Sequence, residues 1–291
     1  MKTIGVLGVG KIGLPIAGNL IKSGHRVVGY RRSSLAEFEK IGGVPARSAA
    51  DVSAQADIVF SVGASARRCR SRPARTHPSA RAGQVVVELG SHPLRDQERQ
   101  VALLARNGAA FVDGEVSGSP GMVAARKAVI YLAGDAGACK TAEQAVVGFA
   151  DACFYFGEFG AASRVKLVNN LLVAINIAAA AEAVALGLEA GVDVPLMIKA
   201  IANGSGGSTR FTIRAPAMAE RRFFPVQATA GNVRHYFCMI SEFADSAGVA
   251  TPLLDCLAPL FERFTQMGLD DKDVAAMIDV ISALPRAKHG P

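Results

Sequence analysis

The 291-residue sequence lacks the marks of several protein classes. Its five cysteines are scattered and contain no CxxC pair, so we expect no structural zinc and no other metal site. No apolar core behind a basic head opens the chain, which predicts that there is no signal peptide. The most apolar stretch, residues 167–190, is interrupted by three asparagines and Glu182. We therefore expect no membrane span, and the cytoplasm is the expected compartment.

Acidic residues are missing from one segment, and this absence accounts for most of the formal charge of +7. Between Ile58 and Val87 the chain has six arginines and no aspartate or glutamate. A protein that binds nucleic acid spreads its basic residues over a face and often adds aromatic side chains for stacking. The arginine-rich stretch, residues 65–83, has no such aromatic residue, so we expect no nucleic-acid partner.

The pattern of the remaining chain predicts two domains, and the length is sufficient for two cores. In the first half, short β-branched runs alternate with helical patterns; the runs begin at Thr3, Arg26, Asp57, Val85, Ala109 and Val129. This rhythm predicts a parallel sheet with crossover helices. A long apolar stretch without proline, residues 163–190, predicts a long helix, and no strand-like run follows it. The expected fold class is α/β: an N-terminal Rossmann domain with a doubly wound parallel sheet (1–161), joined by a long helix to an all-α domain (162–291).

Residues 8–13, GVGKIG, form a GxGxxG motif between the first predicted strand and the first predicted helix. In that context Gly8 permits a tight turn, Gly10 lets the backbone approach a pyrophosphate, and Gly13 lets the helix pack on the strand. The alternative is an ordinary strand-to-helix turn. The motif predicts a dinucleotide site formed by Gly8, Val9, Gly10, Lys11, Ile12 and Gly13.

The end of the second predicted strand bears on the choice of cofactor. An NAD site normally has an acidic residue there, whereas this chain has Arg31, Arg32 and Ser33 after Tyr30. Two guanidinium groups and a hydroxyl suit a 2′-phosphate, so we predict NADP(H) in preference to NAD(H), which stays open. The alternative is that both arginines are solvated surface charges.

The stretch RVKLVNN places polar residues at the start of the long predicted helix. Lys166 and Asn170 are four residues apart and share one helix face. A partly desolvated lysine can exchange a proton with a substrate hydroxyl. The alternatives are a surface lysine that reaches solvent and asparagines that cap or bridge helices. Ser117-Gly118-Ser119 reads as a turn whose N–H groups and hydroxyls could cradle a carboxylate.

Three stretches, GVGKIGLPIAGNLIKSGH, DGEVSGSPG and GAASRVKLVNN, occur in the order that is typical of the β-hydroxyacid dehydrogenases. The chain resembles that family over nearly its whole length. The resemblance implies an NAD(P)-dependent 3-hydroxyacid dehydrogenase or semialdehyde reductase (EC 1.1.1 class), with Lys166 as catalytic acid/base. It further implies that Ser117, Gly118 and Ser119 hold a substrate carboxylate and that Asn170 positions the substrate; Asn169 is an additional candidate. Candidate cofactor contacts at positions matching the family are Gly63, Ala64, Ser91 and His235.

The chain departs from the family pattern at four places. In one motif Glu115 stands where the family usually has proline and Ser119 replaces the second glycine, and in another Ala162 replaces a glycine before the lysine. His235-Tyr236 replaces a Lys-Asp pair, and the arginine-rich stretch replaces a Leu-Pro turn and an amphipathic helix. These departures keep alternatives open: an imine reductase, which usually lacks the lysine, a cofactor-binding homologue with little activity, or a nucleic-acid binder.

Two further expectations concern the helical domain. Its long, weakly charged helix has more apolar surface than a small domain covers, which predicts a homodimer or homotetramer. The substrate is a small carboxylate whose identity depends on side chains such as Phe211, Arg214, Phe223 and Phe224.

Overall fold

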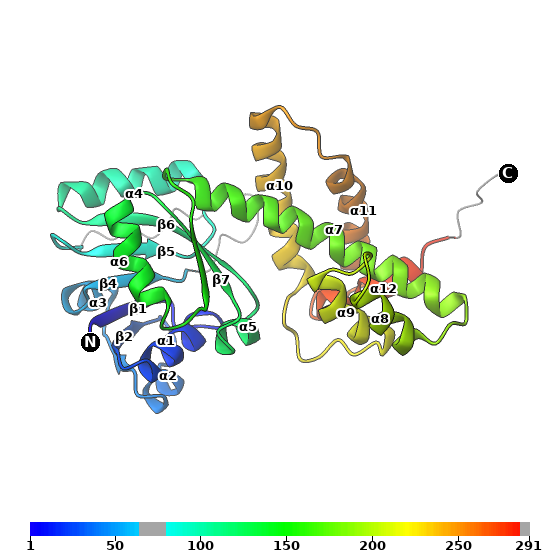
Figure 1. Cartoon of the computed structure of the whole chain (residues 1–291), viewed down its shortest axis with the longest axis horizontal. Helices are drawn as coiled ribbons and strands as arrows, with labels where there is room; N and C mark the ends of the chain where they lie inside the picture. Colours follow the sequence, from blue (N-terminus) through cyan, green and yellow to red (C-terminus); the bar gives the residue numbers. More distant parts are fainter. Residues whose placement is uncertain (64–79, 286–291) are drawn as a thin grey trace. The chain divides into compact units, whose positions relative to one another are not determined.

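The computed structural model describes residues 1–63 and 80–285. The chain divides into two compact units, Met1–Lys166 and Leu167–Pro291, and each is described by itself (Figure 1). Ala64 and most of the arginine-rich stretch lie outside the described residues.

The first unit is built on one eight-stranded sheet of order β3-β2-β1-β4-β5-β6-β7-β8. The strands are β1 (Thr3–Leu7), β2 (Arg26–Tyr30), β3 (Val44–Pro45), β4 (Ile58–Ser61), β5 (Val85–Glu88), β6 (Ala110–Ser117), β7 (Val129–Ala133) and β8 (Ala152–Tyr155). The order reverses between β1 and β4, as expected for a doubly wound sheet that binds a ligand at the switch point. The predicted Rossmann domain is therefore confirmed.

The sheet is not parallel throughout, because β7 runs antiparallel to β6. A parallel crossover needs about a dozen residues or more, usually including a full helix. Residues 118–128 contain only the short helix α5 (Pro120–Ala124) and return the chain directly beside β6. The prediction also missed β3 and β8, which form the two edges of the sheet.

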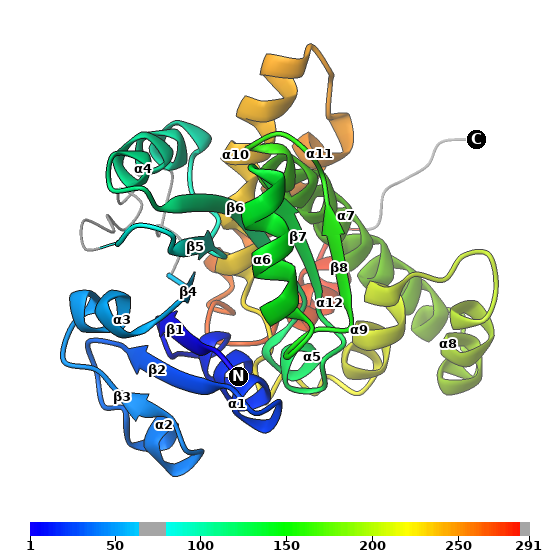
Figure 2. The same cartoon turned by 60° about the vertical axis from the view of Figure 1, so that its left-hand side comes forward.

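Side-chain alternation along the strands gives the sheet two apolar faces. Ile4, Val6, Ile58 and Phe60 pack with α1 (Gly13–Lys22) and α6 (Ala136–Val146) in one core cluster. The opposite face, which includes Val59 and Val86, packs in a second cluster with α3 (Ala49–Gln55) and α4 (Leu94–Arg106). Figure 2 shows α6 crossing the strands β6, β7 and β8, while α2 (Ala36–Lys40) contacts β3 at the edge.

The second unit is helical in its described part, as predicted. The long helix α7 (Ala161–Glu189) begins in the first unit and continues into the second, followed by α8 (Val194–Ala202), α9 (Thr209–Ala219), α10 (Ala230–Ala247), α11 (Pro252–Gln266), a 3₁₀ turn (Val274–Ala276) and α12 (Met277–Ser282). Gly191 and Gly248, with φ of +68° and +67°, follow α7 and α10 in the left-handed conformation that commonly ends a helix. Asp193 caps α8 by accepting from the N–H of Leu196 at 3.0 Å.

The core of the second unit contains a buried ion pair. Arg214 donates from Nη1 to Asp273 Oδ1 at 2.9 Å, and Asp273 also accepts from the N–H groups of Gln227 and Ala228. Phe211 and Phe223 are buried in the same core, whereas Phe224 is exposed. Arg214 was expected to help shape the substrate site, but its guanidinium group is paired with Asp273 in the core.

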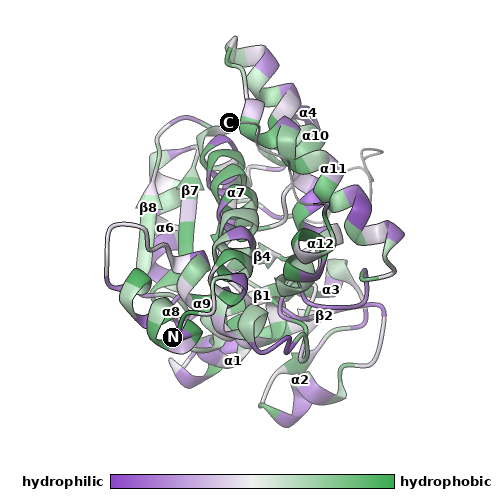
Figure 3. Cartoon of the chain, turned by 90° about the vertical axis from the view of Figure 1, so that its right-hand side faces the viewer, coloured by the Kyte–Doolittle hydropathy of each residue, from purple (hydrophilic) through white to green (hydrophobic). Residues whose placement is uncertain are grey.

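The composition of helix α7 does not fit the expectation that this stretch is too polar to span a membrane. By length and composition it could cross a membrane, because its few polar residues do not outweigh its apolar ones (Figure 3). One such helix is weak evidence for a span, since the core helix of a soluble protein passes the same test. Residues of α7 such as Ile177, Ala181 and Val184 are buried in the core of the second unit.

Candidate active site and cofactor-binding loop

The glycine-rich loop connects β1 to α1 and is built tightly around its first and last glycines. Gly8 has a φ of +104°, and a Cβ there would lie 2.2 Å from the carbonyl oxygen of Val62. A Cβ on Gly13 would lie 2.2 Å from the carbonyl oxygen of Gly8. At Gly10, by contrast, a Cβ would meet no atom within 4 Å. The loop thus packs closely on the sheet and leaves open space at its middle glycine, where a pyrophosphate can approach the start of α1.

Arg31, at the end of β2, is bound to the backbone on both sides. Its Nη1 donates to the carbonyl of Val9 at 3.0 Å, and its Nε donates to the carbonyl of Ser34 at 2.5 Å. Arg31 therefore ties the glycine-rich loop to the loop after β2. The next residues, Arg32 and Ser33, are exposed beside it. These positions fit the predicted 2′-phosphate site, with Arg31 organising the loop and Arg32 presenting its charge to solvent.

Gly63 also lies at the cofactor loop. Its nitrogen would be 3.7 Å from a Cβ on Gly8, directly after the carbonyl of Val62. Lys11 is exposed and Val9 is buried in the core beneath the loop. The predicted neighbour Ala64 lies outside the described residues.

The start of α7 is fixed by a buried carboxylate on β6. Asp113 accepts the N–H of Ser163 at 3.0 Å and its hydroxyl at 2.7 Å. Gln97 on α4 donates to the same hydroxyl oxygen at 3.0 Å. Burial raises the pKa of Asp113, and the hydrogen bonds from Ser163 oppose that shift. These contacts anchor the first turn of α7 to the middle of β6.

Lys166 follows one turn later and is buried, with 9% of its surface exposed. Its Nζ donates to the carbonyl oxygen of Val116 at 2.5 Å. Within the first unit the ammonium group therefore lies at the last peptide of β6, directly before the predicted carboxylate loop. A lysine that reaches solvent is excluded by this burial, and a charged group kept there needs partners or a task.

Asn170 lies four residues further along the same helix. Its side chain is buried and its Nδ2 has no hydrogen-bond partner among the described residues. Its Oδ1 accepts from Asn169 Nδ2 at 3.1 Å, so Asn169 orients the Asn170 amide. An unsatisfied buried amide is costly, and a ligand oxygen would satisfy it.

The loop after β6 contains the predicted carboxylate cradle. Ser117 ends the strand, and a Cβ on Gly118 would lie 2.9 Å from Cβ of Ala128, so only a glycine fits easily there. Ser119 caps α5, because its hydroxyl oxygen accepts from the N–H of Met122 at 3.3 Å. That cap leaves the Ser119 O–H able to donate to a ligand.

Two more acidic side chains belong to this region, Glu115 and its neighbour Glu88, and neither was among the predicted site residues. Glu115 is buried and accepts from the hydroxyl of Ser91 at 2.8 Å. Burial raises the pKa of Glu115 to about 8, against the opposing influence of Lys166 and of the Ser91 hydrogen bond. Glu88, at the end of β5, accepts from the N–H of Gly90 at 2.8 Å and lies 3.8 Å from His92 Nε2. Ser91, predicted as a cofactor contact, thus contacts the lysine's acidic neighbour.

His235 lies on α10 in the second unit. Its ring packs edge-to-face against Tyr236, with centroids 5.3 Å apart, and both ring nitrogens lack hydrogen-bond partners in the described part of the chain. Burial lowers the pKa of His235, which favours the neutral imidazole. A neutral ring can donate one hydrogen bond but does not replace the charge of the lysine that the family has there.

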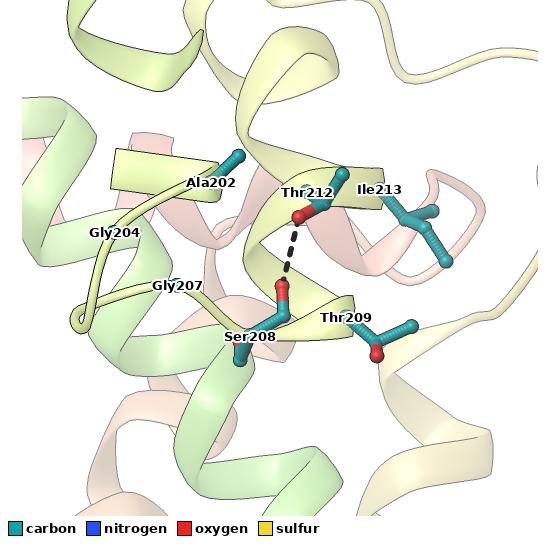
Figure 4. A pocket seen from close by; sticks show the side chains of 7 residues that line it. All are labelled: Ala202, Gly204, Gly207, Ser208, Thr209, Thr212 and Ile213. Atoms are coloured by element: carbon teal, nitrogen blue, oxygen red, sulfur yellow. Dashed lines mark hydrogen bonds between the residues drawn. The ribbon is translucent and has the colours of Figure 1, made fainter. Parts of the chain in front are cut away.

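A separate open pocket of about 500 Å³ lies in the second unit at the start of α9. Ala202, Gly204, Gly207, Ser208, Thr209, Thr212 and Ile213 line it, and no charged side chain is among them (Figure 4). The Thr212 hydroxyl donates to the carbonyl of Ser208 at 3.1 Å, and Ser208 Oγ accepts from the N–H of Phe211. These polar groups serve the helix start, so we assign no ligand to this pocket. In the described residues no group of histidine, cysteine and acidic side chains could hold a metal ion.

Two family models match the chain in sequence order. Residues 3–157 match the NAD binding domain of 6-phosphogluconate dehydrogenase, and residues 160–281 match the domain described as NAD-binding of NADP-dependent 3-hydroxyisobutyrate dehydrogenase. The chain belongs to the β-hydroxyacid dehydrogenase family. The resemblance seen in three sequence motifs is therefore confirmed, and this family member is an oxidoreductase of the EC 1.1.1 class that binds a nicotinamide cofactor.

Individual relatives agree with this assignment. L-threonate dehydrogenase of Cupriavidus necator is 29% identical over 97% of both chains. The crystal structure of 3-hydroxyisobutyrate dehydrogenase from Salmonella typhimurium superposes with a TM-score of 0.84, at 20% identity over 96% of this chain and all of that one. The structure of Psf3 in complex with NADP⁺ and 2-OPP superposes with a TM-score of 0.82 at 21% identity, over 96% of this chain and all of that one.

Proposed function

We propose that this β-hydroxyacid dehydrogenase family member transfers a hydride between NADP(H) and a small β-hydroxy acid or its semialdehyde, with Lys166 as general acid/base. The observation that supports this most directly is the buried Nζ of Lys166 at the carbonyl of Val116, next to the Ser117–Ser119 loop. The relative named L-threonate dehydrogenase supports a hydroxy-acid substrate.

The cofactor would be held by the loop from Gly8 to Gly13 and by the start of α1. When bound, the nicotinamide gives or takes the hydride. Arg32 and Ser33 are proposed to bind the 2′-phosphate, with Arg31 holding their loop in place. Gly63, Ala64 and His235 are proposed as further cofactor contacts. Ser91 was predicted as a cofactor contact too, and we propose that it also holds the Glu115 carboxyl group through its hydrogen bond.

Lys166 would move the proton that accompanies the hydride. In reduction its ammonium group donates a proton to the substrate oxygen, and in oxidation the neutral amine accepts one. The unpartnered Nδ2 of Asn170 would donate a hydrogen bond to the substrate, and the Ser117–Ser119 loop would bind the carboxylate.

Two other functions stay as alternatives. Imine reductases usually lack a lysine at the position of Lys166, so the buried Lys166 favours an alcohol or carbonyl substrate. A homologue that only binds cofactor would be consistent with His235 in place of the family lysine and with the arginine-rich stretch.

The proposed function is tested by following NADPH absorbance at 340 nm against a panel of semialdehydes and hydroxy acids. We expect turnover on at least one carboxylate substrate by wild type, and a loss of kcat of roughly 10²-fold or more in Lys166→Ala with NADPH affinity retained. Lys140→Ala, an exposed lysine on α6, is the matched control and should retain wild-type kcat. Tight NADPH binding without turnover on any substrate would favour the non-catalytic alternative, and a fully active Lys166→Ala would refute the role of Lys166.

We also propose that the chain forms a homodimer or homotetramer in the cytoplasm and does not bind nucleic acid or membranes. Large apolar side chains of α7 are exposed in the single chain: Val168 at 51%, Leu172 at 55% and Leu186 at 72%. Light scattering coupled to gel filtration tests this, and a monomer at micromolar concentration would contradict it.

A further inference from the structure

We propose that Glu115 is a positioning residue for Lys166: its carboxylate is the charge partner that sets the pH range over which the Lys166 side chain carries its proton. The consequence for turnover rests on the proposed function, because it assumes that Lys166 is the acid/base. The pairing itself does not. Glu115 occupies a position where the family usually has proline, so this partner is a property of this chain.

The geometry of β6 brings the two groups together. Asp113, Glu115 and Ser117 share one face of the strand, where Asp113 accepts from Ser163 of α7. One helical turn after Ser163, Lys166 donates to the carbonyl of Val116, directly after Glu115. The Glu115 side chain is 2% exposed and is fixed by the Ser91 hydroxyl at 2.8 Å. Neither group can be screened by bulk water at this burial, so the charge of each acts strongly on the other.

The neighbouring groups of the first unit make Lys166 the relevant partner. On Glu115, Lys166 from α7 acts as the favourable charge, whereas Asp113 on β6 and Glu88 on β5 disfavour a second anion. Asp113 is already bound to Ser163, and Glu88 is bound to Gly90 and lies beside His92. Tyr131 on β7 is the residue registered opposite Glu115.

The effect of Glu115 on the protonation of Lys166 has a definite sign. Above about pH 8, where Glu115 is ionised, its carboxylate favours the ammonium form of the nearby amine, so Glu115 keeps Lys166 protonated to higher pH than a neutral side chain would. In reduction this extends activity to more alkaline pH. In oxidation it delays the appearance of the neutral amine that accepts the proton.

The test reads the ionisation of Lys166 directly, by NMR of the full chain labelled with ¹³C at lysine Cε. The Lys166 signal is assigned by its absence in Lys166→Ala, and its titration midpoint is compared between wild type and Glu115→Gln. We expect the midpoint to fall by about one pH unit or more in Glu115→Gln. Glu98→Gln makes the same chemical change at an exposed position of α4 and should leave the midpoint unchanged. Equal midpoints in wild type and Glu115→Gln would overturn the proposal.

The reciprocal measurement keeps the test decisive if Glu115→Gln does not fold. In Lys166→Ala the side-chain carboxyl carbon of Glu115, assigned in wild type and variant by through-bond experiments, should titrate at higher pH than in wild type, and an unchanged midpoint would overturn the pairing. The alkaline limb of the pH profile for reduction should shift to lower pH in Glu115→Gln. If Lys166→Ala turned over normally while the NMR midpoints shifted, the proposed function would fail and the pairing would stand.

Discussion

The Asp113 carboxylate accepts two hydrogen bonds from Ser163, one from its N–H at 3.0 Å and one from its hydroxyl at 2.7 Å. Together these bonds fix both the position and the rotation of the first turn of α7 on β6. Because Lys166 is three residues further on, the direction of its side chain depends on that turn. The Asp113–Ser163 contact therefore positions the proposed acid/base Lys166 indirectly, by fixing the helix turn that precedes it.

We expect Ser163→Ala to weaken this anchor. Losing the hydroxyl removes one hydrogen bond to the buried Asp113 and one of the two that Gln97 Nε2 donates, which should lower the free energy of unfolding by about 1–3 kcal/mol. Because Lys166 loses its fixed direction, kcat should fall while NADPH affinity stays close to wild type. Urea denaturation and NADPH titration measure these effects. Ser246→Ala, at an exposed position of α10, is the control, and equal stability of both variants would contradict the role of Ser163.

Gly10 and Gly13 should respond differently to the same substitution by alanine. At Gly10 the added methyl group meets no protein atom within 4 Å, so Gly10→Ala should melt near the wild-type temperature. The methyl group would occupy the space through which the pyrophosphate approaches, and we expect the Kd for NADPH to rise about tenfold or more.

In Gly13→Ala the methyl group would lie 2.2 Å from the carbonyl oxygen of Gly8, so the loop itself must move. This variant should lose both thermal stability and NADPH affinity. Differential scanning fluorimetry with and without NADPH separates the two cases, and a Gly10→Ala protein with wild-type affinity would argue against cofactor binding at this loop.

Alanine substitutions of Arg31 and Arg32 should affect cofactor binding differently, because Arg31 is hydrogen-bonded to the backbone and Arg32 is exposed. Arg32→Ala should raise KM for NADPH about tenfold and leave KM for NADH nearly unchanged, since it removes a charge that is proposed to bind the 2′-phosphate. Arg31→Ala should weaken the binding of both NADPH and NADH, because Arg31 donates hydrogen bonds to the carbonyls of Val9 and Ser34 and so holds the loop in place. Steady-state kinetics with both cofactors decide this, and equal effects of Arg32→Ala on both would contradict the predicted preference for NADP(H).

The features that the sequence predicted well are those determined by local patterns. The strand from Thr3 and the glycine turn at Gly8 follow from neighbouring residues, and the structure contains both. The antiparallel direction of β7 depends on the short connection of residues 118–128, and its length is known only once the structure shows that β6 continues to Ser117. Local pattern therefore predicts the elements better than it predicts their direction in the sheet.

Contacts between residues far apart in the chain were not predictable in the same way. Arg214 was a candidate for the substrate site, but Asp273, 59 residues later, binds its guanidinium group in the core. Likewise, the hydrogen bond from Ser91 to Glu115 joins the loop after β5 to β6. A usable signal did exist, because Glu88, Asp113 and Glu115 are acidic residues in otherwise apolar strands, where an ionisable side chain is costly without a purpose.

Burial of Glu115 should make the stability of the protein depend on pH. Its pKa rises from 4.5 in the unfolded chain to about 8 in the folded protein, because burial disfavours the charged form. Between these two values the folded state binds more protons than the unfolded state, so this group lowers stability as the pH rises through that window. Glu115→Gln has no such group, and its stability relative to wild type should increase from about pH 5 to about pH 8. Urea denaturation at several pH values measures the trend, with Glu98→Gln expected to run parallel to wild type; a difference between Glu115→Gln and wild type that stays constant with pH would contradict the raised pKa.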